Sequence, residues 1–107
     1  MKLWVDDLRP APEGWFWCKT VDEAISRISL AMKFQNLEII SLDHDSGTAM
    51  EHFCGKDFIM VLNRMELWQH EGVYDFSKIP IRIHSANPVG VANMRRIIER
   101  NGWTEVR

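Results

Sequence analysis

Short apolar runs and amphipathic segments alternate along this chain of 107 residues. Apolar side chains recur at helical spacing in residues 21–35, in 58–70, and in the segment after Asn87. The shorter apolar and aromatic runs between them predict strands at 2–6, 15–19, 38–43, 80–84 and 103–106. This alternation favours an α/β fold, with a mainly parallel five-stranded sheet and right-handed crossovers.

Local signals place the ends of the predicted helices. Thr20 is suited to cap the first helix, and Glu23 completes a capping box three positions later. Asn87 can cap the third helix, with Pro88 at the first helical position, where a missing N–H costs nothing. Asn101–Gly102 predicts the end of that helix.

The connection between the first two strands leaves two topologies open. About eight residues separate them, whereas a helical crossover needs a dozen or more. An open loop could still join parallel strands, because eight extended residues reach ~27 Å. An antiparallel hairpin is the competing arrangement.

Composition limits the classes of function. The length indicates a single domain over residues 1–107, and the net charge of −2 argues against strong binding to duplex nucleic acid. Cys18 and Cys54 lack the spacing of a zinc site or a disulfide framework. Without a signal-peptide pattern or an apolar run of ~20 residues, we expect a cytoplasmic domain that does not enter membranes. The five tryptophans are expected to fill the core and its rim.

Three of the predicted strands run into polar residues at their carboxyl ends. If these strands are parallel, all three polar clusters lie at one edge of the sheet, where open α/β sheets bind ligands. The clusters are Asp6-Asp7-Leu8-Arg9-Pro10, Asp43-His44-Asp45-Ser46-Gly47 and His84-Ser85-Ala86-Asn87-Pro88.

The acidic residues of these clusters suit a divalent cation. Mg²⁺ and Mn²⁺ prefer oxygen ligands, which Asp6, Asp7 and Asp43 would supply. Asp45 could be a further ligand or could orient His44. The alternative for the first pair is a purely local role, in which the carboxylates end the strand by bonding to the backbone.

Two histidines and several neutral or basic groups complete the predicted site. His44 and His84 could divide the acid and base roles of one reaction, or could serve only structure. Arg9, Ser85 and Asn87 are candidates for holding a phosphate, as is the N-terminus of the third helix. His52 and His70 are expected to be solvated. Arg82 interrupts an apolar strand and, if that strand is central, requires an anionic partner.

The spacing of these clusters resembles receiver domains of two-component signalling, and the chain is most similar to the cyclic-phosphate processing receiver domain family. The blocks that carry this resemblance are Asp6-Asp7-Leu8-Arg9-Pro10, Ser41-Leu42-Asp43-His44-Asp45-Ser46-Gly47 and His84-Ser85-Ala86-Asn87-Pro88-Val89-Gly90. The resemblance implies a small flavodoxin-like, three-layer fold that lacks the helix between its first two strands. Asp6-Asp7 are similar to the receiver acidic pair, Asp43 to the phosphoacceptor, and Ser85 to the hydroxyl residue after strand four. The receiver lysine after strand five has no counterpart, which puts phosphorelay switching in doubt.

The first functional hypothesis is a metal-assisted phosphoesterase that acts on cyclic phosphates, either RNA 2′,3′-cyclic phosphate ends or cyclic nucleotides. The alternative is a non-catalytic receiver-like module that binds a phosphate or nucleotide, or that accepts a phosphoryl group on Asp43. A third hypothesis is a small adaptor whose aromatic face binds a protein. Residues 46–56 are expected to form a mobile loop that helps to select the substrate.

Overall fold

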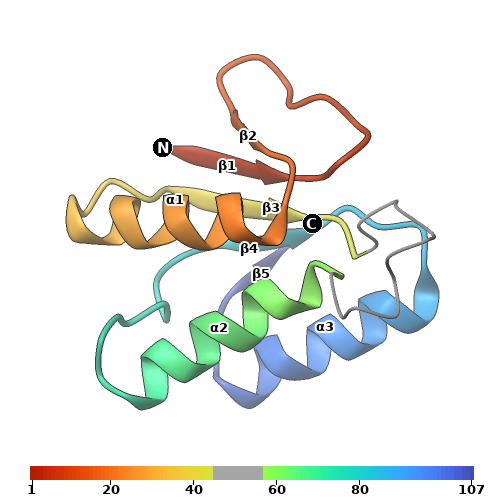
Figure 1. The fold of residues 1–107 in the computed structure, drawn as a ribbon. Coiled ribbons are helices and arrows are strands. Elements are labelled where there is room, and N and C mark those ends of the chain that lie inside the picture. The colour runs from red at the N-terminus through yellow and green to blue at the C-terminus, as the bar shows by residue number, and fades with distance from the viewer. Residues whose placement is uncertain (45–56) are drawn as a thin grey trace.

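The computed structural model describes residues 1–44 and 57–107, and its elements follow the predicted order (Figure 1). The strands are β1 (Lys2–Val5), β2 (Phe16–Cys18), β3 (Ile39–Leu42), β4 (Ile81–Ile83) and β5 (Glu105–Val106). The helices are α1 (Val21–Lys33), α2 (Ile59–His70) and α3 (Pro88–Arg100). Each predicted strand and helix is confirmed, with ends that differ by a few residues. The loop predicted over 46–56, with His52 and Cys54, lies outside the described residues.

The five strands form one sheet in the order β2-β1-β3-β4-β5, and every neighbouring pair is parallel. The open question about the first two strands is therefore settled in favour of the parallel arrangement. Leu3 pairs with Phe16 and Val5 with Cys18, although no helix joins the two strands. The connecting segment crosses as an irregular loop (Figure 1).

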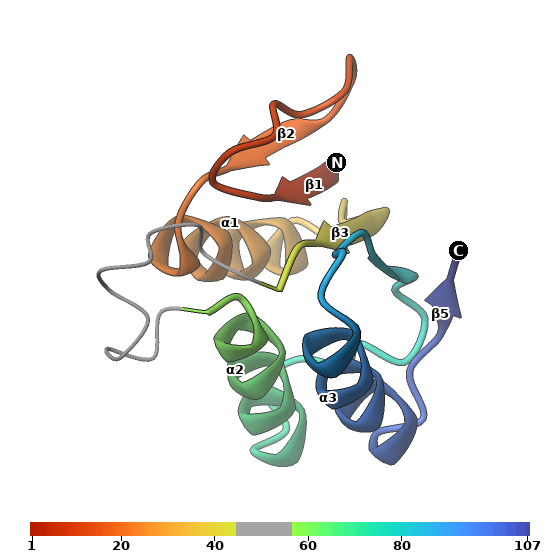
Figure 2. The same cartoon turned by 90° about the vertical axis from the view of Figure 1, so that its right-hand side faces the viewer.

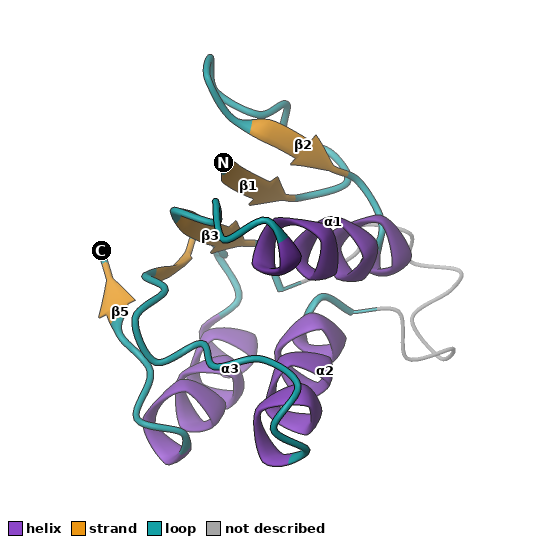
Figure 3. Cartoon of the chain, turned by 90° about the vertical axis from the view of Figure 1, so that its left-hand side faces the viewer, coloured by secondary structure: helices purple, strands orange, loops and turns teal. Residues whose placement is uncertain are grey.

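All three helices lie on the same side of the sheet (Figures 2 and 3). From β2 to β5 every crossover advances in the same direction across the sheet, and right-handed crossovers then place every helix on one face. The fold agrees with the small receiver-like flavodoxin fold that the resemblance implied. The described residues do not form the expected third layer, because none of their helices covers the opposite face of the sheet.

The core lies between the sheet and these helices. Alternate side chains of β1 and β3 point toward the helices, as the two-residue period of a strand requires. Those of Leu3, Val5, Ile40 and Leu42 are fully buried. Trp4 and Trp103 are also buried, and the other three tryptophans are half-buried, so the expected place of the tryptophans in the core and its rim is confirmed.

The predicted helix caps are formed. The Thr20 side chain accepts a hydrogen bond from the Glu23 N–H at 3.1 Å. Asn87 accepts one from the Gly90 N–H, also at 3.1 Å, and Pro88 is the first residue of α3. After α3 the chain turns through Gly102, whose φ of +68° is a conformation that glycine adopts without steric cost.

Two further expectations concern membranes and cysteines. None of the described helices is long and apolar enough to cross a membrane. Cys18 is buried in the core, and this burial raises the pKa of its thiol to about 11, so the group stays neutral at physiological pH.

Two leucines of α2 provide a test of this packing. We expect Leu62→Ala, at a fully buried position, to lower the free energy of unfolding by about 2–5 kcal/mol, because it removes packed methyl groups and leaves a cavity. Leu67→Ala, on the half-exposed side of the same helix, should change it by less than about 0.5 kcal/mol. Urea denaturation of both variants measures the difference, and equal losses would contradict this arrangement of α2.

Candidate functional site

The ends of β1, β3 and β4 are neighbours, as the sequence predicted. The Asp43 N–H donates to the Val5 carbonyl at 2.9 Å, and the His84 N–H donates to the Leu42 carbonyl at 2.8 Å. The parallel ladder therefore continues one residue beyond the strands and brings Asp6, Asp43 and His84 to the same edge. This edge is the carboxyl end of the sheet, where α/β folds place their ligands.

Asp6 is completely buried at the centre of this edge. Its Oδ1 accepts hydrogen bonds from the N–H groups of Leu8 and Arg9, each at 2.9 Å, and its Oδ2 lies 3.1 Å from Nε2 of His84. An unpaired carboxylate in the interior would cost several kcal/mol, and three donors offset that cost. Asp6 therefore makes local hydrogen bonds to the turn after β1, and it holds His84 as well.

The His84 imidazole is also held on its other side. Its Nδ1 lies 2.8 Å from Oγ of Ser41, and its ring is stacked on Trp4, with 3.8 Å between ring centroids and an angle of 7° between the planes. Burial is the main reason why the pKa of His84 is lowered below its ordinary value. The nearby carboxylates of Asp6 and Asp43 raise the pKa of His84 by less than burial lowers it.

These contacts define how the proton of a neutral His84 is placed. A carboxylate can only accept, so the Nε2–H of His84 donates to Asp6. Nδ1 is then the acceptor, and the Ser41 hydroxyl donates to it. Ser41 is fully buried, so it cannot act as an exposed nucleophile. Both ring nitrogens of His84 are engaged by the protein in this arrangement.

His44 lies against the first turn of α3. A β-carbon at Gly90 would be 2.6 Å from Cδ2 and from Nδ1 of His44, a distance that atoms in real structures do not reach. The imidazole therefore occupies the space that a side chain at position 90 would need. The carbonyl of His44 accepts a hydrogen bond from the N–H of Phe58, just before α2, at 2.8 Å. His44 is thus fixed between the starts of two helices.

The predicted phosphate-binding residues also lie along this edge. Nη1 of Arg9 donates to the carbonyl of His84 at 3.2 Å, and the remainder of its side chain is exposed. Oγ of Ser85 accepts a hydrogen bond from the N–H of Asn87 at 3.1 Å, while the Asn87 side chain caps α3. Oδ1 of Asp43 accepts from the N–H of His44 at 2.8 Å.

The predicted metal ligands show no complete coordination group. Within residues 1–44 and 57–107, no three His, Cys, Asp or Glu side chains are arranged to hold a metal ion. A cation at Asp6 would have to share oxygens that already accept three hydrogen bonds. Asp45, the fourth acidic candidate, lies outside the described residues.

The structure departs from the expectation for Arg82 and agrees with the expectation for His70. Arg82 is half-buried in β4, yet none of the described residues forms the expected ion pair with it. The reason is that Arg82 belongs to the face of the sheet without helices, where a long side chain reaches solvent. His70 is exposed near the end of α2, as predicted.

Three residues of the site were not identified from the sequence as functional. Ser41 and Trp4 hold the His84 ring, and Gly90 makes room for His44. A serine inside the apolar run Ile-Ile-Ser-Leu was a usable signal, because a buried hydroxyl needs a partner. Gly90 lies at the end of a block that carries the family resemblance, although no role was assigned to it. Trp4 carried no such signal, since an aromatic residue in a strand has many explanations.

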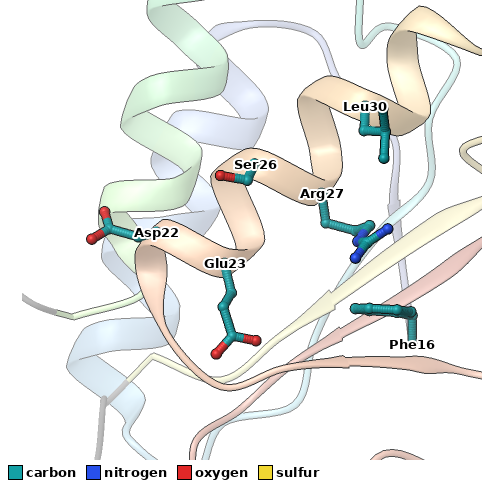
Figure 4. A pocket seen from close by; sticks show the side chains of 6 residues that line it. All are labelled: Phe16, Asp22, Glu23, Ser26, Arg27 and Leu30. Atoms are coloured by element: carbon teal, nitrogen blue, oxygen red, sulfur yellow. The ribbon is translucent and has the colours of Figure 1, made fainter.

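A hollow of about 400 Å³ lies elsewhere, between β2 and α1 (Figure 4). Its wall includes Phe16 and Leu30 at one end and acidic Asp22 and Glu23 at the other. The guanidinium of Arg27 lies over the Phe16 ring, 4.0 Å from its centroid. None of the predicted site residues lines this hollow, so it is separate from the edge described above.

Comparison with known proteins agrees with the resemblance in the motifs. Residues 1–100 match the family model described as the cyclic-phosphate processing receiver domain. No curated protein and no solved structure matches the chain.

The contact between Gly90 and His44 can be tested with a mutant cycle. Alanine at a helical position is ordinarily about 1 kcal/mol more favourable than glycine. We expect Gly90→Ala nevertheless to lower the free energy of unfolding by about 1–3 kcal/mol, because its methyl group collides with the His44 ring. In a His44→Ala background the same change should be stabilising. Chemical denaturation of the four proteins measures this, and the same effect in both backgrounds would contradict the contact.

The lowered pKa of His84 predicts a dependence of stability on pH. The unfolded chain takes up a proton near the ordinary pKa of 6.5, and the folded chain does so only at lower pH. The free energy of unfolding is therefore unaffected by His84 protonation above about pH 6.5. It decreases as the pH falls from there toward the lower pKa of the folded chain, by at most about 1.4 kcal/mol per pH unit. His84→Gln should remove this slope, whereas His70→Gln, at an exposed position, should preserve it. Denaturation at pH 5–8 measures the slope, and an unchanged slope in His84→Gln would disprove the assignment.

Proposed function

Because the chain belongs to the cyclic-phosphate processing receiver domain family, we propose that the carboxyl edge of its sheet binds and hydrolyses a cyclic phosphate. The substrate class is RNA with a 2′,3′-cyclic phosphate end, or a cyclic nucleotide. The observation that carries this proposal is the position of His44 against Gly90, in the first turn of α3. A helix N-terminus favours anions, so a proton-transferring imidazole lies where a phosphate would be held.

The phosphate would be bound by groups from three segments. The guanidinium of Arg9 is tethered to this edge through the His84 carbonyl, and its remaining N–H groups can donate to phosphoryl oxygens. The Ser85 hydroxyl accepts from Asn87 and can donate its own hydrogen to the ligand. Asn87 would contribute through the cap, which fixes the direction of the first turn of α3.

The proposed reaction opens the phosphate ring with water. The water oxygen forms a bond to phosphorus, and one of the two ester P–O bonds breaks. His44 takes a proton from the attacking water and later releases it to solvent, and a solvent water gives a proton to the departing oxygen, so the products are a phosphomonoester and a free hydroxyl. His84 is a positioning residue in this proposal, because Asp6 and Ser41 engage both of its ring nitrogens. Asp45 remains the proposed partner that orients His44.

A divalent cation, Mg²⁺ or Mn²⁺, remains part of the proposal in a modified form. Asp6 would stay with His84, and Asp7 and Asp43 would hold the cation, since Mg²⁺ commonly binds one or two carboxylates and keeps several waters. When bound, the cation would stabilise negative charge that develops on the phosphate.

A second candidate function is binding of a cyclic phosphate without turnover. Two observations favour it: both nitrogens of His84 are engaged, and the described residues hold no complete metal-binding group. Such a module would be stabilised against heat by its ligand and would release no product.

The test is hydrolysis of a panel of 2′,3′-cyclic and 3′,5′-cyclic nucleotides, followed by ³¹P NMR with and without Mg²⁺. We expect His44→Gln to reduce kcat by roughly 100-fold or more, as for loss of a general acid or base. His70→Gln, a change of the same kind at an exposed position, should leave kcat unchanged. Absence of hydrolysis in the unmodified protein would reject the enzyme, and thermal stabilisation by the same nucleotides would then support the binding module.

A further inference from the structure

The sheet face opposite the helices has an unusual composition. Strand register and two-residue alternation place aromatic, aliphatic, hydroxyl and cationic side chains on this face. These strand positions are Lys2, Trp4, Trp17, Ile39, Ser41, Arg82 and Val106. Trp4 and Ser41 are buried, so the other five positions form the accessible part of the face. None of them is acidic, although the chain as a whole has a net charge of −2.

Aromatic rings and cations lie together on this face. The ammonium of Lys19 lies 4.4 Å from the ring centroid of Trp17, and that of Lys2 lies 5.9 Å from the centroid of Trp15. Both tryptophans are half-buried, so part of each ring is accessible. Arg82 is half-buried as well, and its guanidinium has no ion pair among residues 1–44 and 57–107.

The face is continuous with the candidate site. Trp4 stacks on His84 at one side and meets Trp15 edge to face at the other, with 5.9 Å between the tryptophan centroids. The indole N–H of Trp17 donates to the Asp6 carbonyl at 2.6 Å. The aromatic contacts therefore run from His84 at the carboxyl edge of the sheet through Trp4 to Trp15. No helix of the described chain lies on this face (Figure 3).

We propose that this face binds single-stranded RNA that leads into the site, which makes an RNA 3′ end, rather than a free nucleotide, the preferred substrate. The inference rests on the proposed function for the position of the terminus. Cations spaced among aromatic rings match the alternation of phosphates and bases in a single strand, and sheet faces of this kind bind about two or three nucleotides. A 2′,3′-cyclic phosphate requires a ribose 2′-hydroxyl, so the strand is RNA.

The experiment compares the binding of three probes to the full chain by tryptophan fluorescence. They are a hexanucleotide RNA with a 2′,3′-cyclic phosphate end, the same RNA with a 3′-hydroxyl, and a 2′,3′-cyclic mononucleotide. We expect the cyclic hexanucleotide to bind most tightly. Arg82→Gln should weaken its binding roughly threefold or more and reduce the slope of log affinity against log salt by about 0.7. Binding and turnover of the mononucleotide should not change.

Arg64→Gln is the control that removes the same charge elsewhere, because Arg64 lies on helix α2, over Trp68. It should affect none of the probes. Lys19→Gln, at an exposed position, provides a second variant that does not depend on the tolerance of a strand to substitution at Arg82. Thermal melting confirms that each variant is folded.

The outcomes separate this inference from the proposed function. Equal affinity for the cyclic hexanucleotide and the mononucleotide, or equal loss in Arg64→Gln and Arg82→Gln, would overturn the RNA-binding face while leaving hydrolysis intact. Equal binding of the two hexanucleotides, with loss in Arg82→Gln, would support the face and count against recognition of the cyclic end. Self-association through this face in sedimentation, without RNA binding, would replace RNA with a second copy of the chain.

Discussion

The buried hydrogen bonds of the His84 imidazole connect the strands that form the candidate site. Through Asp6 they reach the end of β1, through Ser41 they reach β3, and the histidine itself follows β4. The stack on Trp4 closes one face of the ring, and burial keeps the neutral form preferred. Asp6 depends on the same ring, because a buried carboxylate is tolerated only when its oxygens accept hydrogen bonds. The carboxyl edge of the sheet is thus organised around one imidazole whose two nitrogens are engaged by Asp6 and Ser41.

This arrangement changes how the two histidines are understood. Their similar positions after two strands suggested similar roles, yet the structure gives them different surroundings. His84 is enclosed by a carboxylate, a hydroxyl and an indole, whereas His44 lies over a glycine in the first turn of a helix. An imidazole whose nitrogens are already engaged holds its neighbours in place. One beside a helix N-terminus is better placed to exchange protons with a bound anion.

The absence of a helix between β1 and β2 leaves one face of the sheet without a helical layer in the described chain. The remaining crossovers run in one direction, so their helices cover one face and leave the other to side chains of the sheet and of the loop after β1. Trp15 covers Trp4 edge to face, and cations lie over exposed parts of the indole rings. Tryptophans therefore shield from water a surface that a helix would otherwise cover, and they do so beside the candidate site.

The sequence by itself determined the elements and their caps, because periodicity, Thr20 and Asn87 act through neighbouring residues. It predicted that three polar clusters meet at one edge on the condition that their strands are parallel. It left open the pairing of β1 with β2, because a connection of about eight residues permits either direction. It suggested an internal partner for Arg82, because the sequence pattern does not show which face of the sheet the helices cover. Only the tertiary structure decided that Ser41 and Asp6 share His84, and that Gly90 accommodates His44. The physical reason is that these contacts join residues more than forty positions apart. The register of the strands and the position of α3 after β4 bring them within hydrogen-bonding or van der Waals distance.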